Sequence, residues 1–145
     1  MQPVIDVEIS INDKVCESIS VPLTSNSRFK LRVCSLDDII AEKLRALLQQ
    51  PMRNRHRQQD IYDIALKFRN NQSHLDYLKI GKFLQAKSEI RGVDAKRSAF
   101  NSDVKSRAEY EYDKRIREQT GKYFIPFNDA WALVLDLVRK LDLPD

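Results

Sequence analysis

The stretch that decides the fold is residues 35–50, SLDDIIAEKLRALLQQ, whose apolar residues recur with a helical period. Ser35 and Asp38 are spaced as in a capping box, which marks the start of a helix. Pro51 disfavours the helical conformation at the residue before it, so we expect the helix to end near Gln50. The pattern therefore predicts one amphipathic helix over 35–50.

Three runs of alternating apolar and polar residues precede this helix, at 4–11, 15–21 and 29–33. An alternation with a period of two is typical of half-buried strands. Short polar stretches separate the runs, and such stretches favour local turns. We therefore expect about three short strands in residues 1–34, arranged as an antiparallel meander.

Helical patterns return after Pro51 and continue almost to the end of the chain. We expect a second helix over 58–69 and a third that opens at Ser73, whose spacing to Asp76 again resembles a capping box. The densely charged region 87–119 predicts one or two exposed helices.

A last helix, predicted to start after residues 126–128, carries a wide apolar stripe that should pack inward. With 4–6 helices in residues 35–145, the chain is predicted to be a single α+β domain, with a short antiparallel meander followed by a helical region.

Composition narrows the class of protein. The chain has 145 residues, of which 42% are hydrophobic and 32% are charged, so it can bury a core without a metal or a disulfide. No run approaches the length of a membrane span and no signal-peptide pattern begins the chain, so we expect a cytoplasmic protein that makes no membrane contact.

Cys16 and Cys34 form no CxxC pair and are expected to be small core or strand residues. The net charge of +4 permits contact with nucleic acid without requiring it.

Lys43 stands in the middle of the apolar stripe of the predicted 35–50 helix, between Ile40, Leu44 and Leu47 on a helical wheel. An ammonium group is costly there unless it has a partner or lines a cavity. One interpretation is that Lys43 extends from the edge of the core to water or to a carboxylate. The other is that it is a functional cation at the floor of a cleft.

Two carboxylates lie at the start of the predicted 58–69 helix. Asp60 flanks the apolar stripe near the helix N-terminus, where an anion is favoured, and it is also the natural counterpart of Lys43. Asp63 can pair with Lys67 at a spacing of four residues, which would be a structural role.

Between these helices lies a basic loop at residues 53–57, Arg-Asn-Arg-His-Arg. Guanidinium groups of Arg53, Arg55 and Arg57 beside the free N–H groups of a helix start are suited to phosphate binding. The alternative is a solvated basic turn.

The segments SLDDIIAEKLRALL at 35–48 and DIYDIAL at 60–66 resemble the later half of the AbiEii/AbiGii family of nucleotidyltransferase toxins. The resemblance implies a nucleotidyltransferase-like fold and a place in toxin–antitoxin biology or phage defence. It also implies that Lys43, Asp60 and Asp63 occupy active-site positions. Gln59 stands where the family usually has arginine.

The chain lacks two features that such enzymes carry upstream, a glycine-rich helix start and a strand with an Asp-x-Asp pair. Its three glycines are Gly81, Gly92 and Gly121, and it contains no Asp-x-Asp. Activity would require Mg²⁺ and a nucleoside triphosphate, and only Asp6 and Glu8 on the first predicted strand offer further metal ligands. We therefore expect the chain alone to be weak or inactive, as a shortened relative or one half of a split enzyme.

Several partners follow from these predictions. The resemblance implies an acceptor such as tRNA or other RNA, together with an antitoxin. The strand at 4–11 is expected to present an unpaired edge, which favours a homodimer or a separate partner that supplies the missing N-terminal part. The alternative function is a non-catalytic module that binds RNA, phosphate or a partner protein through the basic residues at 28–32 and 53–57.

Overall fold

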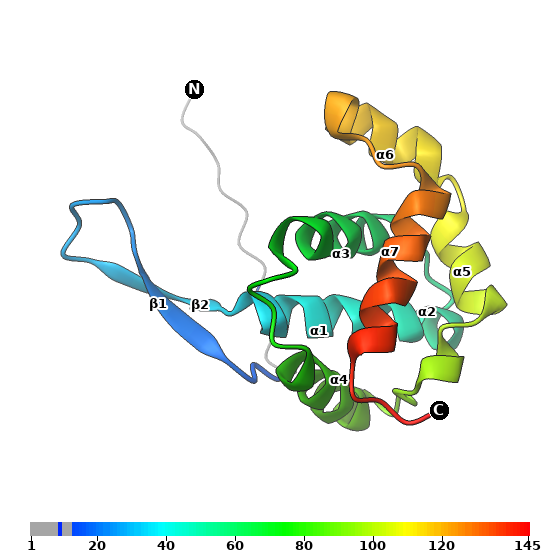
Figure 1. Cartoon of the computed structure of the whole chain (residues 1–145), viewed down its shortest axis with the longest axis horizontal. Helices are drawn as coiled ribbons and strands as arrows, with labels where there is room; N and C mark the ends of the chain where they lie inside the picture. The colour runs from blue at the N-terminus through cyan, green and yellow to red at the C-terminus, as the bar shows by residue number, and fades with distance from the viewer. Residues whose placement is uncertain (1–8, 10–12) are drawn as a thin grey trace.

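A two-stranded hairpin projects from a body of helices in the computed structural model, which describes Ile9 and residues 13–145 (Figure 1). The α+β class is confirmed. The elements in chain order are β1 (Ser18–Pro22), β2 (Lys30–Cys34), α1 (Leu36–Leu48), α2 (Gln50–Arg53), α3 (Gln58–Asn71), α4 (Tyr77–Arg91), α5 (Ser102–Glu109), α6 (Tyr112–Thr120) and α7 (Phe127–Lys140).

The hairpin contains two of the predicted strands, with bounds shifted by one to three residues. β1 and β2 are antiparallel, with Ile19 opposite Val33 and Val21 opposite Leu31. The predicted strand at 4–11 lies outside the described residues apart from Ile9, which belongs to no regular element.

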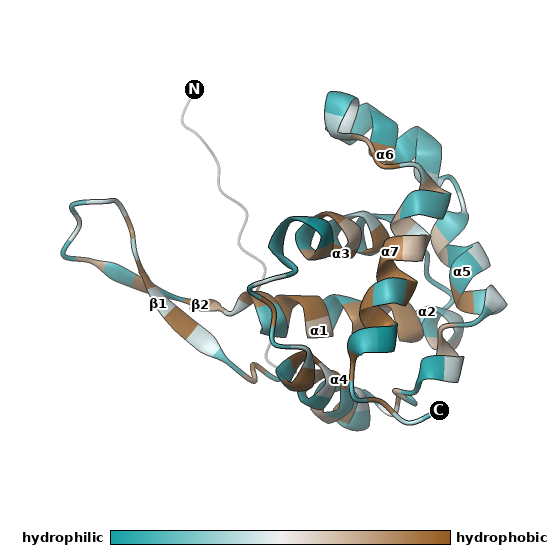
Figure 2. Ribbon diagram, viewed as in Figure 1, coloured by the Kyte–Doolittle hydropathy of each residue, from teal (hydrophilic) through white to brown (hydrophobic). Residues whose placement is uncertain are grey.

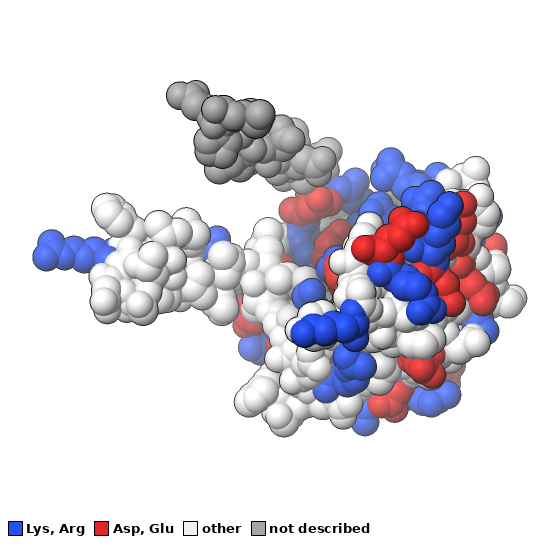
Figure 3. All heavy atoms as spheres, turned by 90° about the horizontal axis from the view of Figure 1, so that it is seen from above, with Lys and Arg blue, Asp and Glu red and all other residues white. Residues whose placement is uncertain are grey.

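One face of the hairpin is apolar and uncovered in the described structure. Because directly opposite residues share a face, Ile19, Val21, Leu31 and Val33 form one apolar surface, of which Leu31 is 50% exposed. Apolar segments alternate with polar ones along both strands in Figure 2, and the space-filling view in Figure 3 shows a mostly uncharged hairpin. The helical body in the same view mixes basic and acidic side chains.

α1 begins as predicted, although only half of the capping box forms. Ser35 is the N-cap, and its Oγ accepts a hydrogen bond from the Asp38 N–H at 3.2 Å. The Asp38 carboxylate does not return this bond, because it accepts instead from the Cys16 N–H at 3.2 Å. The helix ends at Leu48, and α2 follows with Pro51 in its first turn, where a missing N–H costs nothing.

The predicted start of the third helix at Ser73 is wrong. α3 runs on to Asn71, and the chain then turns, with the His74 N–H donating to the Asn71 carbonyl at 2.8 Å. Asp76 is the true N-cap of α4, since its Oδ1 accepts from the Lys79 N–H at 3.0 Å. In the region 87–119, the end of α4 is followed by a 3₁₀ helix at Arg97–Ala99 and by α5 and α6. The described residues hold seven α-helices, including the four-residue α2, and a second 3₁₀ helix lies at Gly121–Tyr123.

The core lies where α1 packs against α3 and α4 and where α3 packs against α7 (Figure 1). Tyr112 from α6 is fully buried and donates its hydroxyl to the Ile125 carbonyl at 3.1 Å, and burial raises the pKa of this tyrosine far above its usual value. None of the helices that the structure describes has both the length and the apolarity of a membrane span. The largest fully buried aliphatic side chains are those of Ile40, Leu44, Leu47, Ile61, Ile64, Ile80, Leu84, Ile116, Leu137 and Leu141.

Candidate functional site

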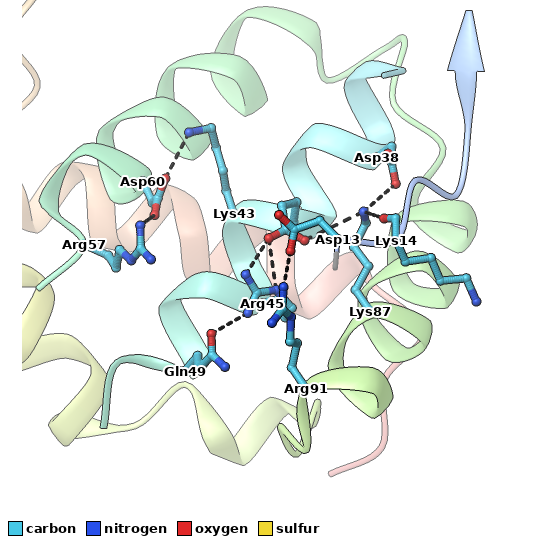
Figure 4. Close-up of polar contacts among 11 residues, drawn as sticks. Asp13, Lys14, Asp38, Lys43, Arg45, Gln49, Arg57, Asp60, Lys87 and Arg91 are labelled. Carbon is cyan, nitrogen blue, oxygen red and sulfur yellow. Dashed lines mark hydrogen bonds and ion pairs between the residues drawn. The ribbon is translucent and has the colours of Figure 1, made fainter. Parts of the chain in front are cut away.

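Lys43 is held between two carboxylates of the neighbouring helix. Its Nζ lies 3.0 Å from Asp60 Oδ1 and 2.7 Å from Asp63 Oδ2. Lys43 comes from α1, and the two aspartates are three residues apart on α3, so they project from the same side of that helix. Figure 4 shows the Lys43 and Asp60 side chains pointing toward each other. The structure thus brings together the three residues that the sequence analysis placed at the site.

Opposing effects act on the Lys43 ammonium. Burial on its own lowers the pKa of Lys43, but the hydrogen bonds and charges of Asp63 and Asp60 outweigh burial and raise the pKa above its ordinary value. The side chain is only 22% exposed, so little water screens these contacts. Lys43 therefore remains a fixed cation at neutral pH and cannot act as a general base.

The predicted pairing of Asp63 with Lys67 is wrong. Asp63 contacts Lys43 through Oδ2 and accepts a hydrogen bond from Gln59 Nε2 at 3.1 Å through Oδ1. The partly buried ammonium of Lys43 requires anionic partners, so the contact between α1 and α3 prevails over the pairing with Lys67 one turn away on α3. Gln59 thus holds one of the two aspartates in place.

The Lys43–Asp60 pair lies on the wall of a cavity of about 390 Å³. Residues 13–15 and Cys34, near the base of the hairpin, and helices α1, α3 and α4 enclose this space. A cavity of this size can hold a phosphate group or a larger part of a nucleotide. Its charged lining residues are Asp13, Lys14, Asp38, Glu42, Lys43, Arg45, Arg57, Asp60 and Lys87.

A second ion cluster in this cavity was not found from the sequence. Lys87 is 4% exposed, and its Nζ lies 3.0 Å from Asp38 Oδ1 and 3.8 Å from Glu42 Oε2. It also donates to the Lys14 carbonyl oxygen. The signal was present, because Lys87 continues the buried positions Ile80 and Leu84 along α4, but it stands in a region that looked uniformly charged.

Most cations of the cavity are engaged by acidic partners, as the dashed lines of Figure 4 mark. Arg45 donates to Glu42 and Gln49, and Lys87 pairs with Asp38. Arg91, which does not line the cavity, donates to the lining residue Asp13. An anionic ligand would therefore have to compete with carboxylates that already occupy these cations.

The residues of the cavity do not form a Mg²⁺ site. Mg²⁺ needs an octahedral set of oxygen ligands. Over Ile9 and residues 13–145, no group of three or more His, Cys, Asp or Glu gathers in a way that could hold a metal ion. Asp6 and Glu8, the predicted metal ligands, lie outside the described residues. Asp60 and Asp38 have lysine nitrogen atoms as close partners, which occupy the positions that a cation would take.

Both cysteines are free thiols near the base of the hairpin, and Cys34 lines the cavity. Burial raises the pKa of Cys16 and that of Cys34, so neither thiol is activated as a nucleophile.

The arginines of the basic loop fall into two groups. Arg57 Nη1 lies 3.8 Å from Asp60 Oδ2, and Arg57 lines the cavity beside Lys43. Arg55 and Arg57 together line a second cavity of about 320 Å³. Arg53 is exposed at the end of α2 and lines neither of these cavities. Arg53 thus stands apart from Arg55 and Arg57, and the phosphate-binding role of the three arginines stays a prediction.

Comparison with protein families matches residues 1–132 of the 145 to the family described as "Nucleotidyl transferase AbiEii toxin, Type IV TA system". Comparisons with curated proteins and with solved structures give no match. The family match covers α1, α3 and the Lys43–Asp60–Asp63 cluster that they form. This chain therefore belongs to the AbiEii nucleotidyltransferase toxin family of type IV toxin–antitoxin systems.

Proposed function

We propose that this chain supplies one part of a nucleotidyltransferase toxin site, the part made by Lys43, Asp60 and Asp63, and that it transfers little or no nucleotide alone. The observation that carries the proposal is the Lys43 ammonium, held between two carboxylates at the wall of a cavity. The Lys43 side chain is 22% exposed, whereas Lys87, which lines the same cavity, is 4% exposed, so a ligand in the cavity reaches Lys43 more readily.

Each residue has a distinct role in the proposal. Nucleotidyl transfer needs positive charge on the phosphate oxygens and a hydroxyl group aligned for attack. Lys43 supplies the fixed charge, because its pKa is raised by the two aspartates after burial has opposed them. When a phosphate oxygen takes the place of a carboxylate at Lys43, Asp60 is released to orient the attacking hydroxyl or to accept its proton. Mg²⁺ would supply further charge neutralisation, but the described residues do not form a site that fits it.

The test is a transfer assay with labelled nucleoside triphosphates, Mg²⁺ and bulk tRNA. We expect no label on the RNA with the chain alone. We expect label when the chain is fused behind an AbiEii-family segment that carries the glycine motif and the Asp-x-Asp strand. Lys43→Ala and Asp60→Ala should abolish transfer by the fused protein, whereas the matched control Lys67→Ala should keep it.

Three outcomes contradict the proposal. Efficient transfer by the unfused chain overturns the predicted inactivity. A fused protein that transfers no label overturns the assignment of this chain to the active site. Full activity of the fused Lys43→Ala variant overturns the role of the lysine.

A second candidate function is binding of RNA or phosphate without catalysis. It is favoured by the second cavity, which Arg55 and Arg57 line and whose described lining residues include no carboxylate. RNA binding without transfer, weakening steeply with added salt, indicates this function.

Protein partners are also part of the proposal. Membership of a type IV toxin–antitoxin family supports an antitoxin as one partner. The homodimer through the strand edge at 4–11 stays a prediction, and sedimentation at rising protein concentration tests it. A monomer at the highest concentration contradicts it.

A further inference from the structure

The second cavity, which we call the arginine pocket, lies between the loop after α2 and the junction of α5 and α6. It has a volume of about 320 Å³. None of the described residues that line it is acidic, which distinguishes it from the cavity at Lys43. Its lining residues are Arg55, His56, Arg57, Gln58, Tyr110 and Arg115.

The backbone of the basic loop is fixed by two glutamine side chains. The buried amide of Gln50 accepts from the Arg57 N–H at 2.8 Å and donates to the Val104 carbonyl at 3.2 Å. Gln58 Nε2 donates to the Tyr110 carbonyl at 2.5 Å. A solvated basic turn needs no such support. The arginines are thus presented from a preorganised frame, which lowers the entropy that ligand binding costs.

Guanidinium groups in the pocket retain free donors. The Arg55 side chain makes no hydrogen bond or ion pair with any residue that the structure describes. Arg115 donates Nε and Nη2 to Glu111 Oε2, which leaves Nη1 available. Arg57 has only the long 3.8 Å contact with Asp60. The start of α3 has no side-chain cap, so its first N–H groups add to the positive potential.

An aromatic surface adjoins these cations. The Tyr110 ring is 54% exposed, and its centroid lies 4.7 Å from that of His56. His56 Nδ1 lies 3.0 Å from the Arg107 carbonyl oxygen, so this nitrogen carries a hydrogen and donates it. Aromatic faces beside arginines are the platform on which single-stranded nucleic acids stack their bases.

The two cavities are linked by one residue, because Arg57 lines both. We propose that the arginine pocket binds a phosphate group of a single-stranded polynucleotide through Arg55 and Arg115. A base of that strand then stacks on Tyr110, and the strand passes Arg57 toward the Lys43–Asp60 pair. This inference rests on the proposed function and deepens it by naming where the acceptor strand lies.

The experiment measures binding of a fluorescently labelled single-stranded RNA to the full chain by anisotropy, over a series of salt concentrations. Arg55→Gln and Arg115→Gln should each weaken binding about tenfold, as expected for the loss of a charged hydrogen bond. Each should reduce the slope of log Kd against log salt by about 0.7. Tyr110→Ala should weaken binding without changing the slope, and Tyr110→Phe should bind as the parent does.

Arg139→Gln is the matched control, because it removes the same charge from an exposed arginine that lines neither cavity. Equal binding by Arg55→Gln, Arg115→Gln and Arg139→Gln overturns the proposal. Titration of the unlabelled chain with inorganic pyrophosphate distinguishes the source of the phosphate. Binding of RNA alone or of both ligands supports a polynucleotide site, whereas binding of pyrophosphate alone overturns it.

Binding is measured without catalysis, so the two proposals fail separately. A fused protein that transfers label while Arg55→Gln binds RNA normally contradicts only the arginine pocket. Loss of RNA binding in Arg55→Gln, with no transfer by the fused protein, contradicts the assignment of this chain to the active site and leaves the arginine pocket supported as an RNA-binding site.

Discussion

Two lysines on neighbouring helices show how position decides the role of one residue type. The Lys43 side chain is 22% exposed and opens on the cavity between its aspartates. The Lys87 side chain is 4% exposed and pairs with Asp38, which is 2% exposed. Both lysines line the same cavity, but Lys87 is far more buried and pairs with a buried carboxylate, so its role is structural. The proposed ligand-binding role falls to Lys43, which is the more accessible of the two.

Loss of the Lys87 charge should strongly destabilise the chain. Lys87→Met leaves the Asp38 carboxylate buried without its cation, and removal of one member of a buried pair costs about 3–5 kcal/mol. Urea unfolding measures the change in the free energy of unfolding. Lys82→Met, at an exposed position of the same helix, should change it by less than about 0.5 kcal/mol. Equal stability of the two variants would refute the structural role of Lys87.

The raised pKa of Lys43 predicts a defined pH dependence. Because its pKa is higher in the folded chain than in the unfolded chain, its stabilising contribution is complete below the unfolded value of about 10.4. That contribution is lost as the pH rises through the higher folded value. The difference in unfolding free energy between the parent and Lys43→Met should therefore be constant from neutral pH to about pH 10 and shrink above it. If the difference in unfolding free energy between the parent and Lys43→Met grows above pH 10, the raised pKa of Lys43 is contradicted.

The residues of the site were predictable to different degrees. Lys43 was found because a charge in an apolar stripe is conspicuous, and Asp60 because it flanks the stripe of the next helix. Asp63 was given the wrong partner, since the helix-local pairing with Lys67 ignored a contact between helices. Tyr110 and Arg115 were missed because they lie more than fifty residues beyond Arg55, and only the packing of the helices brings them together.

At the scale of helices and strands, local signals predicted most elements but not all of their ends. Ser35 and Pro51 act through their immediate neighbours, so the limits that they predict for α1 hold to within two residues. The spacing of Ser73 and Asp76 fits a capping box equally well, but Asp76 itself caps the helix. The spacing alone therefore does not show whether Ser73 or Asp76 is the N-cap of the helix.

The corrected start of α4 makes a simple prediction. Asp76→Ala removes the acceptor of the Lys79 N–H and should cost about 1 kcal/mol of unfolding free energy. Ser73→Ala changes an exposed residue of the preceding turn and should cost less than about 0.5 kcal/mol. Thermal or urea unfolding of the two variants measures both values, and a larger loss from Ser73→Ala would restore the earlier helix start.

For the whole molecule, the hairpin and the helical body differ in what covers their apolar residues. Leu44 and its neighbours are enclosed by α3 and α4, whereas no described residue covers the apolar face of the hairpin. Hydrophobic periodicity predicted a half-buried apolar surface both for the strands of the hairpin and for α1. It could not show that the hairpin face is left uncovered by the described residues, because periodicity reports which side is apolar and not what lies against it.

This difference should appear in stability measurements. Leu31→Lys adds a charge to the open face of the hairpin and should change the unfolding free energy by less than about 0.5 kcal/mol. Leu44→Ala creates a cavity in the core and should cost about 2–5 kcal/mol. A large loss of stability from Leu31→Lys would mean that the hairpin face is covered in solution.

Several polar contacts fasten the base of the hairpin, among them the Glu17–Lys79 pair at 2.8 Å and the Asp38 carboxylate. Asp38 Oδ1 accepts the Cys16 N–H just before β1 and also binds the Lys87 ammonium from α4. Asp38 therefore ties together the segment before β1, the first turn of α1 and the end of α4, which are far apart in the sequence. Loss of this carboxylate removes a contact with the projecting hairpin and a contact with α4 at once, while the Glu17–Lys79 pair still joins the base of the hairpin to α4 (Figure 1).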